Sequence, residues 1–155
     1  MIRLFAMDVD GTLTDGGIYM DGEREFKRFD VKDGQGIAEL LKRGVKIAFI
    51  SGRCSEPTRQ RADNLHISCC INGTGDKLME LRRLCDEWHI SQSEVAFAGD
   101  DTPDIECIKW AGLGIAVSDA HPLTAAAADF VTKAPGGRGA IRESAEYILK
   151  INNGE

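Results

Sequence analysis

The sequence predicts an α/β fold, in which a doubly wound parallel sheet carries helices on both faces. Apolar runs typical of buried strands alternate with helical patterns along the 155 residues. Carboxylate, hydroxyl and lysine side chains follow several of these runs, at the positions where ligands bind in open α/β sheets. A hairpin signal interrupts the alternation once, directly after the first strand.

The strands are predicted from short apolar runs bounded by turn residues. The run from Ile2 to Met7, with Arg3 as its one interruption, is typical of a buried strand. In order, we expect strands over 2–8, 45–50, 68–71, 95–99, 113–117 and 129–132.

The helices are predicted between these strands from apolar stripes at helical spacing. Ile37, Leu40 and Leu41 give the first helix such a stripe, and Leu81 and Leu84 belong to that of the third. In order, we expect helices over 35–43, 56–65, 76–89, 103–111 and 121–127, with a last one over 139–150.

Residues 14–32 break the alternation. Asp21-Gly22 lies between two strand-prone runs, which predicts a β-hairpin. A two-stranded hairpin is marginal in water by itself. The apolar residues Ile18, Met20, Phe26 and Phe29 therefore need another surface to cover them, and a neighbouring subunit is the natural candidate.

The composition limits the class of protein. With 43% hydrophobic and 28% charged residues, the chain is an ordinary globular protein, expected as one domain over 1–155. The net charge of -6 argues against a nucleic-acid partner. No apolar run approaches the ~18 residues of a membrane span, and the chain begins with a strand instead of a signal peptide.

The five cysteines form no CxxC pair and are odd in number, so we expect reduced thiols in a cytoplasmic protein. The three histidines also lack the spacing of a metal site and are expected to be structural.

The segment Asp8-Val9-Asp10-Gly11-Thr12 closes the first strand and carries the clearest chemical signal. A carboxylate can act as a nucleophile toward phosphorus, and a second carboxylate nearby can move the proton. Two negative charges in one pocket raise the pKa of one of them unless a cation offsets them.

Three later segments place polar groups at the same edge of the sheet. Ser51, with the exposed backbone of Gly52, could bind phosphate oxygens, or it could merely begin a loop or cap the next helix. Lys77 opens a helix, where a cation is unfavourable and a functional role is indicated. The acids Asp100, Asp101 and Asp104 follow the fourth strand, and with Asp8 and Asp10 they would repel one another without a divalent ion such as Mg²⁺.

These four segments resemble the motifs of the haloacid dehalogenase superfamily of aspartyl-phosphate phosphatases, with a Rossmann-like core. The motifs at positions 8, 51, 77 and 100 lie 43, 26 and 23 residues apart, which leaves no room for a cap domain. Ser51-Gly52-Arg53 and Gly136-Gly137-Arg138-Gly139 are also similar to the capless 3-deoxy-D-manno-octulosonate 8-phosphate (KDO 8-phosphate) phosphatases, although Asn72-Gly73 replaces a frequent Gln-Gly. The resemblance implies a hairpin flap and a homotetramer.

The resemblance also implies a role for each residue. Asp8 would attack phosphorus, Asp10 would be the general acid and then the general base, and Ser51 and Lys77 would bind the phosphoryl oxygens. Mg²⁺ would be held by the side chains of Asp8 and Asp100 and the main-chain carbonyl of Asp10. Asp101 and Asp104 would support this site from behind. The residues expected to bind the substrate, a phosphorylated sugar acid, are Thr12, Gly52, Arg53, Arg61 and Arg138.

Three other functions remain open at this point. A related phosphatase could act on nine-carbon 9-phosphates of the sialic-acid type, although Arg53 favours the eight-carbon sugar. The same fold also occurs as a non-catalytic oligomerisation module, but all four motifs stand intact here. A phospho-accepting receiver domain would lack an acid two residues after its phosphorylated aspartate, so Asp10 argues against it.

Overall fold

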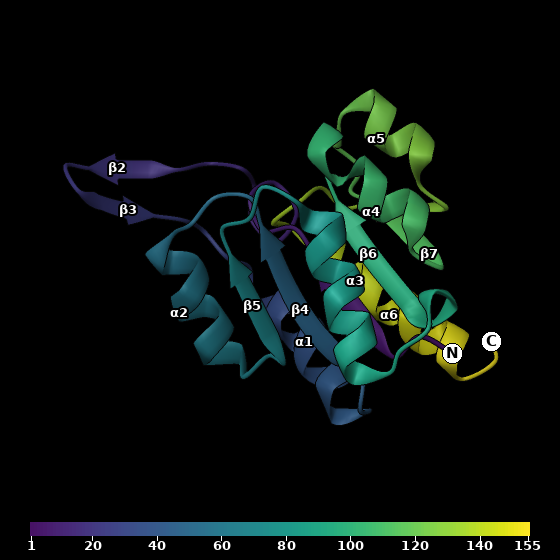
Figure 1. Cartoon of the computed structure of the whole chain (residues 1–155). Helices are drawn as coiled ribbons and strands as arrows, with labels where there is room; N and C mark the ends of the chain where they lie inside the picture. Colours follow the sequence, from purple (N-terminus) through teal and green to yellow (C-terminus); the bar gives the residue numbers. More distant parts are fainter.

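A six-stranded parallel sheet forms the centre of the structure, a computed structural model that describes residues 1–155. The strand order is β5-β4-β1-β6-β7-β8 (Figure 1). The strands are β1 (Leu4–Met7), β4 (Lys46–Ser51), β5 (Cys69–Asn72), β6 (Val95–Gly99), β7 (Leu113–Ala116) and β8 (Phe130–Val131). All five pairings are parallel, so the prediction of a doubly wound sheet is confirmed.

Helices cover both faces of this sheet. Their bounds are α1 (Val31–Lys42), α2 (Glu56–Leu65), α3 (Lys77–Trp88), α4 (Ile105–Trp110), α5 (Pro122–Ala127) and α6 (Ala140–Asn152), with short 3-10 turns over Gln92–Glu94 and Thr102–Asp104. Each predicted helix is present. The first begins at Val31 instead of residue 35, because the side chain of Asp30 accepts a hydrogen bond from Lys32 N and caps the helix there.

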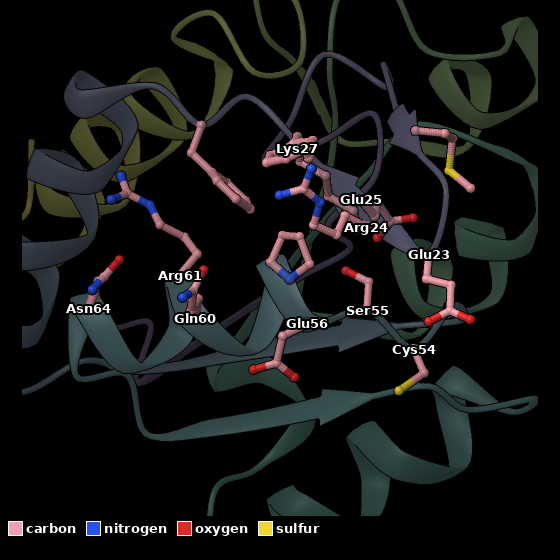
Figure 2. A pocket seen from close by; sticks show the side chains of 14 residues that line it. Glu23, Arg24, Glu25, Lys27, Cys54, Ser55, Glu56, Gln60, Arg61 and Asn64 are labelled. Carbon is pink, nitrogen blue, oxygen red and sulfur yellow. The ribbon is translucent and has the colours of Figure 1, made fainter.

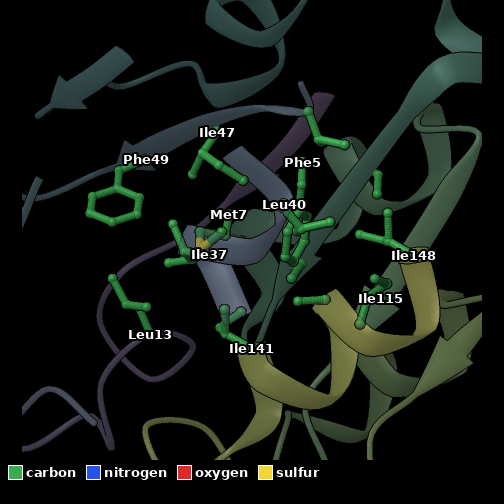
Figure 3. Packing of buried hydrophobic residues seen from close by; sticks show 14 of the residues in the cluster. Phe5, Met7, Leu13, Ile37, Leu40, Ile47, Phe49, Ile115, Ile141 and Ile148 are labelled. Carbon is green, nitrogen blue, oxygen red and sulfur yellow. The ribbon is translucent and has the colours of Figure 1, made fainter. Parts of the chain in front are cut away.

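Two hydrophobic clusters lie on opposite faces of β1. Phe5 and Met7 point into the cluster beneath α1 and α6, where they meet Ile37 and Ile141 (Figure 3). Leu4 and Ala6 alternate to the other face and pack under α3 and α4. Because both faces are covered, the strand is apolar along its whole length, which explains the apolar residues from Leu4 to Met7 in the sequence.

The hairpin is present as β2 (Tyr19–Asp21) and β3 (Arg24–Phe26), with Gly22 in the turn at φ +61°. It projects from the sheet edge (Figure 1). Met20 is 70% exposed and Phe26 50% exposed. Phe29 is an exception to the prediction, because it is half-buried against the core at the base of the hairpin and needs no other cover.

The three histidines all lie at helix ends. His66 and His89 are the C-caps of α2 and α3 in the left-handed region, and His121 caps α5 through its Nδ1 atom. They therefore have structural positions, as the sequence predicted. No helix of the structure has the length and apolar character needed to cross a membrane.

Asp33 of α1 stabilises the start of a second helix. It is fully buried, and its Oδ1 accepts a hydrogen bond of 2.9 Å from Arg142 N in the first turn of α6. The α6 N-cap is Gly139, which offers no side-chain cap of its own. Burial raises the pKa of Asp33, and the hydrogen bond from Arg142 N offsets part of this cost of burying the carboxylate.

We expect Asp33→Ala to lower the free energy of unfolding by about 1–2 kcal/mol, because α6 loses its capping acceptor. Asp33→Asn keeps an acceptor oxygen without a charge and should lose less. Urea denaturation measures both, with the exposed Asp63→Ala as the matched control. Equal midpoints for Asp33→Ala and the control would contradict this role.

Candidate active site

The predicted motifs meet at the carboxyl ends of three neighbouring strands. Asp8 directly follows β1, Ser51 ends β4 and Asp100 directly follows β6, and β1 lies between the other two strands. Lys77 is the first residue of α3, which follows β5. The parallel topology thus gathers residues that are up to 92 positions apart in the sequence, from Asp8 to Asp100.

Lys77 joins two aspartates at the centre of the site. Its Nζ lies 2.9 Å from Asp8 Oδ1 and 2.7 Å from Asp104 Oδ1. All three side chains are buried, with Lys77 only 11% exposed. The second oxygen of Asp104 accepts hydrogen bonds from the backbone N–H groups of Asp100 and Asp101.

The charges in this cluster perturb one another strongly. Burial would lower the pKa of Lys77, but the carboxylates of Asp8 and Asp104 outweigh it and raise that pKa. Burial and the charge of Asp104 raise the pKa of Asp8, and Lys77 opposes this only in part. The positive charge of one lysine therefore does not fully offset the negative charge of the carboxylates around it.

Asp100 completes the cluster from the other side. Burial, followed by the hydrogen bond and charge of Asp8, raises the pKa of Asp100 to about 9. Its Oδ1 accepts a hydrogen bond of 3.0 Å from Thr12 Oγ1. Gly11, at φ +89°, leaves room for the carboxylate, because a Cβ atom there would overlap it.

The cluster fits a hard divalent cation. Oxygen atoms of Asp8, Asp100 and Asp104 lie within 4.8 Å of one another. Since both oxygens of Asp104 are already bound, Asp8 and Asp100 remain as carboxylate ligands. The main-chain carbonyl of Asp10 accepts no backbone hydrogen bond, so it is also free to bind a metal. This donor set of oxygens and excess negative charge suits Mg²⁺.

Asp10 lies outside this cluster and has partners of its own. Its Oδ1 forms an ion pair of 2.7 Å with Lys27 Nζ, and its Oδ2 lies 3.6 Å from Arg53 Nε. Arg53 in turn forms a close ion pair with Glu25 of β3. The side chain of Asp10 is 24% exposed, which makes it accessible to a ligand.

Ser51 ends β4, and the residue is only 1% exposed. Its hydroxyl donates to the carbonyl of Arg53 and accepts from Arg53 N, which fixes the tight turn after the strand. Ser55, and not Ser51, is the N-cap of α2. Of the two structural alternatives, Ser51 therefore belongs to the loop and does not cap the helix.

The residues expected to bind substrate are less closely gathered. Gly52 lies beside Lys77, and Arg53 reaches Asp10. Arg138 pairs with Asp15 at 3.6 Å, next to the first motif. Thr12 is fully buried, and its hydroxyl donates a hydrogen bond to the Asp100 carboxylate.

Arg61 does not contact the aspartates of the predicted motifs within this chain. It bonds to the carbonyl of Asp30 and lies over the ring of Phe29, and no hydrogen bond or ion pair joins it to the motif residues. It lines a cleft of about 760 Å³ between the hairpin and α2, together with Gln60 and Asn64 (Figure 2).

Asp101 has no contact with Lys77. Its side chain is exposed and accepts from Thr102 N, where it caps the short turn before α4. Asp104, and not Asp101, holds Lys77. The sequence analysis did not identify Lys27, Glu25 or Thr58 as residues of the site. Lys27 and Glu25 lie in the charged run Glu23–Arg28, where nothing in the sequence indicates that the lysine side chain is buried.

The fold and the site are those of a metal-dependent phosphohydrolase. The family model for haloacid dehalogenase-like hydrolases matches residues 70–141. The chain is 42% identical to the 3-deoxy-D-manno-octulosonate 8-phosphate phosphatase of Escherichia coli K12 over 150 residues, which cover 96% of this chain and 79% of that protein.

Solved structures agree with this comparison. The phosphatase of the same name from Moraxella catarrhalis, in complex with magnesium, phosphate and KDO, has a TM-score of 0.95 at 44% identity, covering 98% of this chain and 88% of that one. The cobalt-bound enzyme of Haemophilus influenzae has a TM-score of 0.94 at 34% identity, covering 98% and 90%. The chain belongs to the family of 3-deoxy-D-manno-octulosonate 8-phosphate phosphatases.

Proposed function

We propose that this protein is a Mg²⁺-dependent phosphatase that hydrolyses KDO 8-phosphate to KDO and phosphate through an aspartyl phosphate. The observation that carries the proposal is the buried group of Asp8, Asp100 and Lys77 at the end of β1, in a chain 42% identical to such enzymes. We also propose that residues 1–155 act as one domain, with 14–32 as its flap.

The first half of the reaction transfers the phosphoryl group to the protein. The carboxylate of Asp8 forms a bond to phosphorus as the bond between phosphorus and the sugar oxygen breaks, and Asp10 donates a proton to that oxygen. Lys77 and Ser51 bind the other phosphoryl oxygens. Mg²⁺, held by Asp8, Asp100 and the Asp10 carbonyl, supplies positive charge that lets two anions approach.

The second half returns the protein to its starting state. Asp10, now a carboxylate, takes a proton from a water molecule that attacks phosphorus, and the bond to Asp8 breaks to release phosphate. Asp104 keeps Lys77 in place throughout, because it holds Nζ at 2.7 Å and is itself fixed by two backbone N–H groups.

The experiment that tests this function is a comparison of kcat/KM for KDO 8-phosphate, a sialic-acid 9-phosphate and several hexose phosphates, with and without Mg²⁺. We expect Mg²⁺-dependent release of phosphate, with the eight-carbon substrate preferred. A preference for the nine-carbon substrate would show that the proposed substrate is wrong. If no phosphate were released from any of these esters, the enzymatic function would be contradicted.

Arg53 is the residue that we propose to contact the sugar carboxylate. It is 45% exposed, lies beside Asp10 and is oriented by Glu25. We expect Arg53→Ala to raise KM for KDO 8-phosphate about tenfold or more, since a hydrogen bond to a charged group contributes about 1.5–3 kcal/mol. KM for a small neutral phosphate ester should change much less.

The control for this prediction is Arg59→Ala, which removes an exposed arginine from α2 without breaking an ion pair. Steady-state kinetics on both esters give the comparison. An equal rise of KM for the acidic and the neutral ester would argue against a carboxylate contact.

We further propose that the protein forms a homotetramer in which the hairpin closes a neighbouring site. Exposed apolar residues on the hairpin, Tyr19, Met20 and Phe26, and the cleft beside it support this assembly. Arg61 and Arg138 would then reach the pocket of another subunit. Light scattering coupled to size-exclusion chromatography would contradict the proposal if it gave a monomeric mass.

The five cysteines are free in the structure. This agrees with the reducing cytoplasm, which we propose as the location of the enzyme.

A further inference from the structure

Lys27 is buried in a way that an ordinary lysine is not. Its side chain has 0% exposure, although the residue follows β3 at the base of a hairpin that is otherwise exposed. The residue lies at the cleft between the hairpin and α2 (Figure 2). An ammonium group is expensive to bury unless it is paired and hydrogen-bonded.

Two partners lie against this ammonium group, the carboxylate of Asp10 in an ion pair and the hydroxyl of Thr58 in a hydrogen bond. Nζ lies 2.7 Å from Asp10 Oδ1 and donates a hydrogen bond of 3.0 Å to Thr58 Oγ1. Thr58 is fully buried in the first turn of α2, and its hydroxyl is within 3.0 Å of the hydroxyl of Ser55, the N-cap. Lys27 therefore connects Asp10 to the start of α2.

The site consequently contains two networks, each centred on a lysine. Lys77 forms ion pairs with Asp8 and Asp104, whereas Lys27 forms an ion pair with Asp10. The only other cation within 4.0 Å of the Asp10 carboxylate is Arg53, whose Nε at 3.6 Å from Oδ2 is too far for a hydrogen bond. Lys27 is thus the group that fixes the orientation of Asp10.

This contact also distinguishes the two oxygens of Asp10. A lysine ammonium has only donor hydrogens, so Oδ1, which lies against Nζ, is not the oxygen that carries a proton. Oδ2 is left for that purpose. The proton that moves to the leaving oxygen, and later the proton taken from water, would both pass through Oδ2.

We propose that Lys27 is a positioning residue that holds Asp10 with Oδ2 directed to the reacting group, and so couples the base of the hairpin to proton transfer. The inference rests on the proposed phosphatase function. Lys27 itself touches neither phosphate nor sugar. Its position, immediately after β3, makes the correct orientation of Asp10 depend on a folded hairpin.

The test compares leaving groups, because a positioned acid matters most when the leaving oxygen is a poor one. Protonation by a general acid contributes typically 10²–10⁴-fold to such steps. The alcohol of a sugar phosphate needs this proton, whereas the nitrophenolate of p-nitrophenyl phosphate leaves without it. The value of kcat/KM reports the step that breaks this bond.

We expect Lys27→Met to reduce kcat/KM for KDO 8-phosphate at least about tenfold more than for p-nitrophenyl phosphate, both with saturating Mg²⁺. The control is Lys42→Met, which removes an exposed lysine from α1 and should leave both values unchanged. An equal loss on the two substrates would show a merely structural role and overturn the inference.

A second variant covers the case in which Lys27→Met does not fold. Thr58→Val keeps the shape of a buried side chain and removes the hydroxyl that is the second partner of Nζ, together with its contact to Ser55 Oγ. We expect a several-fold loss that is again selective for the sugar phosphate, and an unselective change would overturn the inference. Failure of the wild-type protein to hydrolyse either ester would instead contradict the phosphatase function itself.

Discussion

Asp8→Asn is expected to abolish phosphatase activity, with a loss of at least about 10³-fold in kcat, while the fold stays intact. The amide cannot form the aspartyl phosphate. The variant should not lose stability, because burial and Asp104 already raise the pKa of Asp8 and so disfavour its charge. Lys77 keeps its ion pair with Asp104 in the variant.

Phosphate release in the presence of Mg²⁺ measures the loss, and thermal unfolding reports the fold. Asp86→Asn, which changes an exposed acid on α3, is the matched control and should retain wild-type activity. A residual rate above a few per cent of wild type would rule out Asp8 as the nucleophile.

Lys77→Met is expected to reduce both activity and stability. Nζ lies within 3 Å of two buried carboxylates, and removing one partner of a buried ion pair costs about 3–5 kcal/mol. The variant would also lose the lysine that is proposed to bind the phosphoryl oxygens. We therefore expect a decrease of about 3 kcal/mol in the free energy of unfolding together with a loss of turnover.

The loss of stability should depend on pH. Lys77 lowers the pKa of Asp8, so its removal raises that pKa further above the value of an unfolded chain, 3.8. A carboxyl group whose pKa is raised by folding loses stability as pH rises, because the folded state binds more protons. Urea denaturation should show a larger deficit at pH 8 than at pH 5.

Lys109→Met, on the exposed side of α4, is the control for this variant. If Lys77→Met were as stable as this control at pH 8, the charges of Asp8 and Asp104 would not depend on Lys77 for their compensation.

The chemical core of the site could be predicted because each part lies at the end of a strand. Asp8, Ser51 and Asp100 each occur where an apolar run stops, and parallel strands in this order must bring those ends together. The fold was predictable for the same reason, since strands covered on both faces are apolar throughout. Even Lys77 could be singled out, because a cation is unfavourable at the start of a helix.

Side chains whose role depends on a partner across the fold were not predictable. Lys27 and Glu25 occur in a run of charges that is typical of an exposed surface, and nothing local shows that one of them is fully buried against Asp10. The contact of Thr12 was not predictable either, because its hydroxyl donates to Asp100, 88 positions away.

The amino-acid order alone determined which groups this protein brings to its sheet edge, since strand ends and their polar successors are local features of the chain. Only the tertiary structure decided how the acids are shared between the two lysines, with Asp8 and Asp104 on Lys77 and Asp10 on Lys27. The reason is that such pairing depends on distances and burial between elements far apart in sequence, which periodicity does not encode.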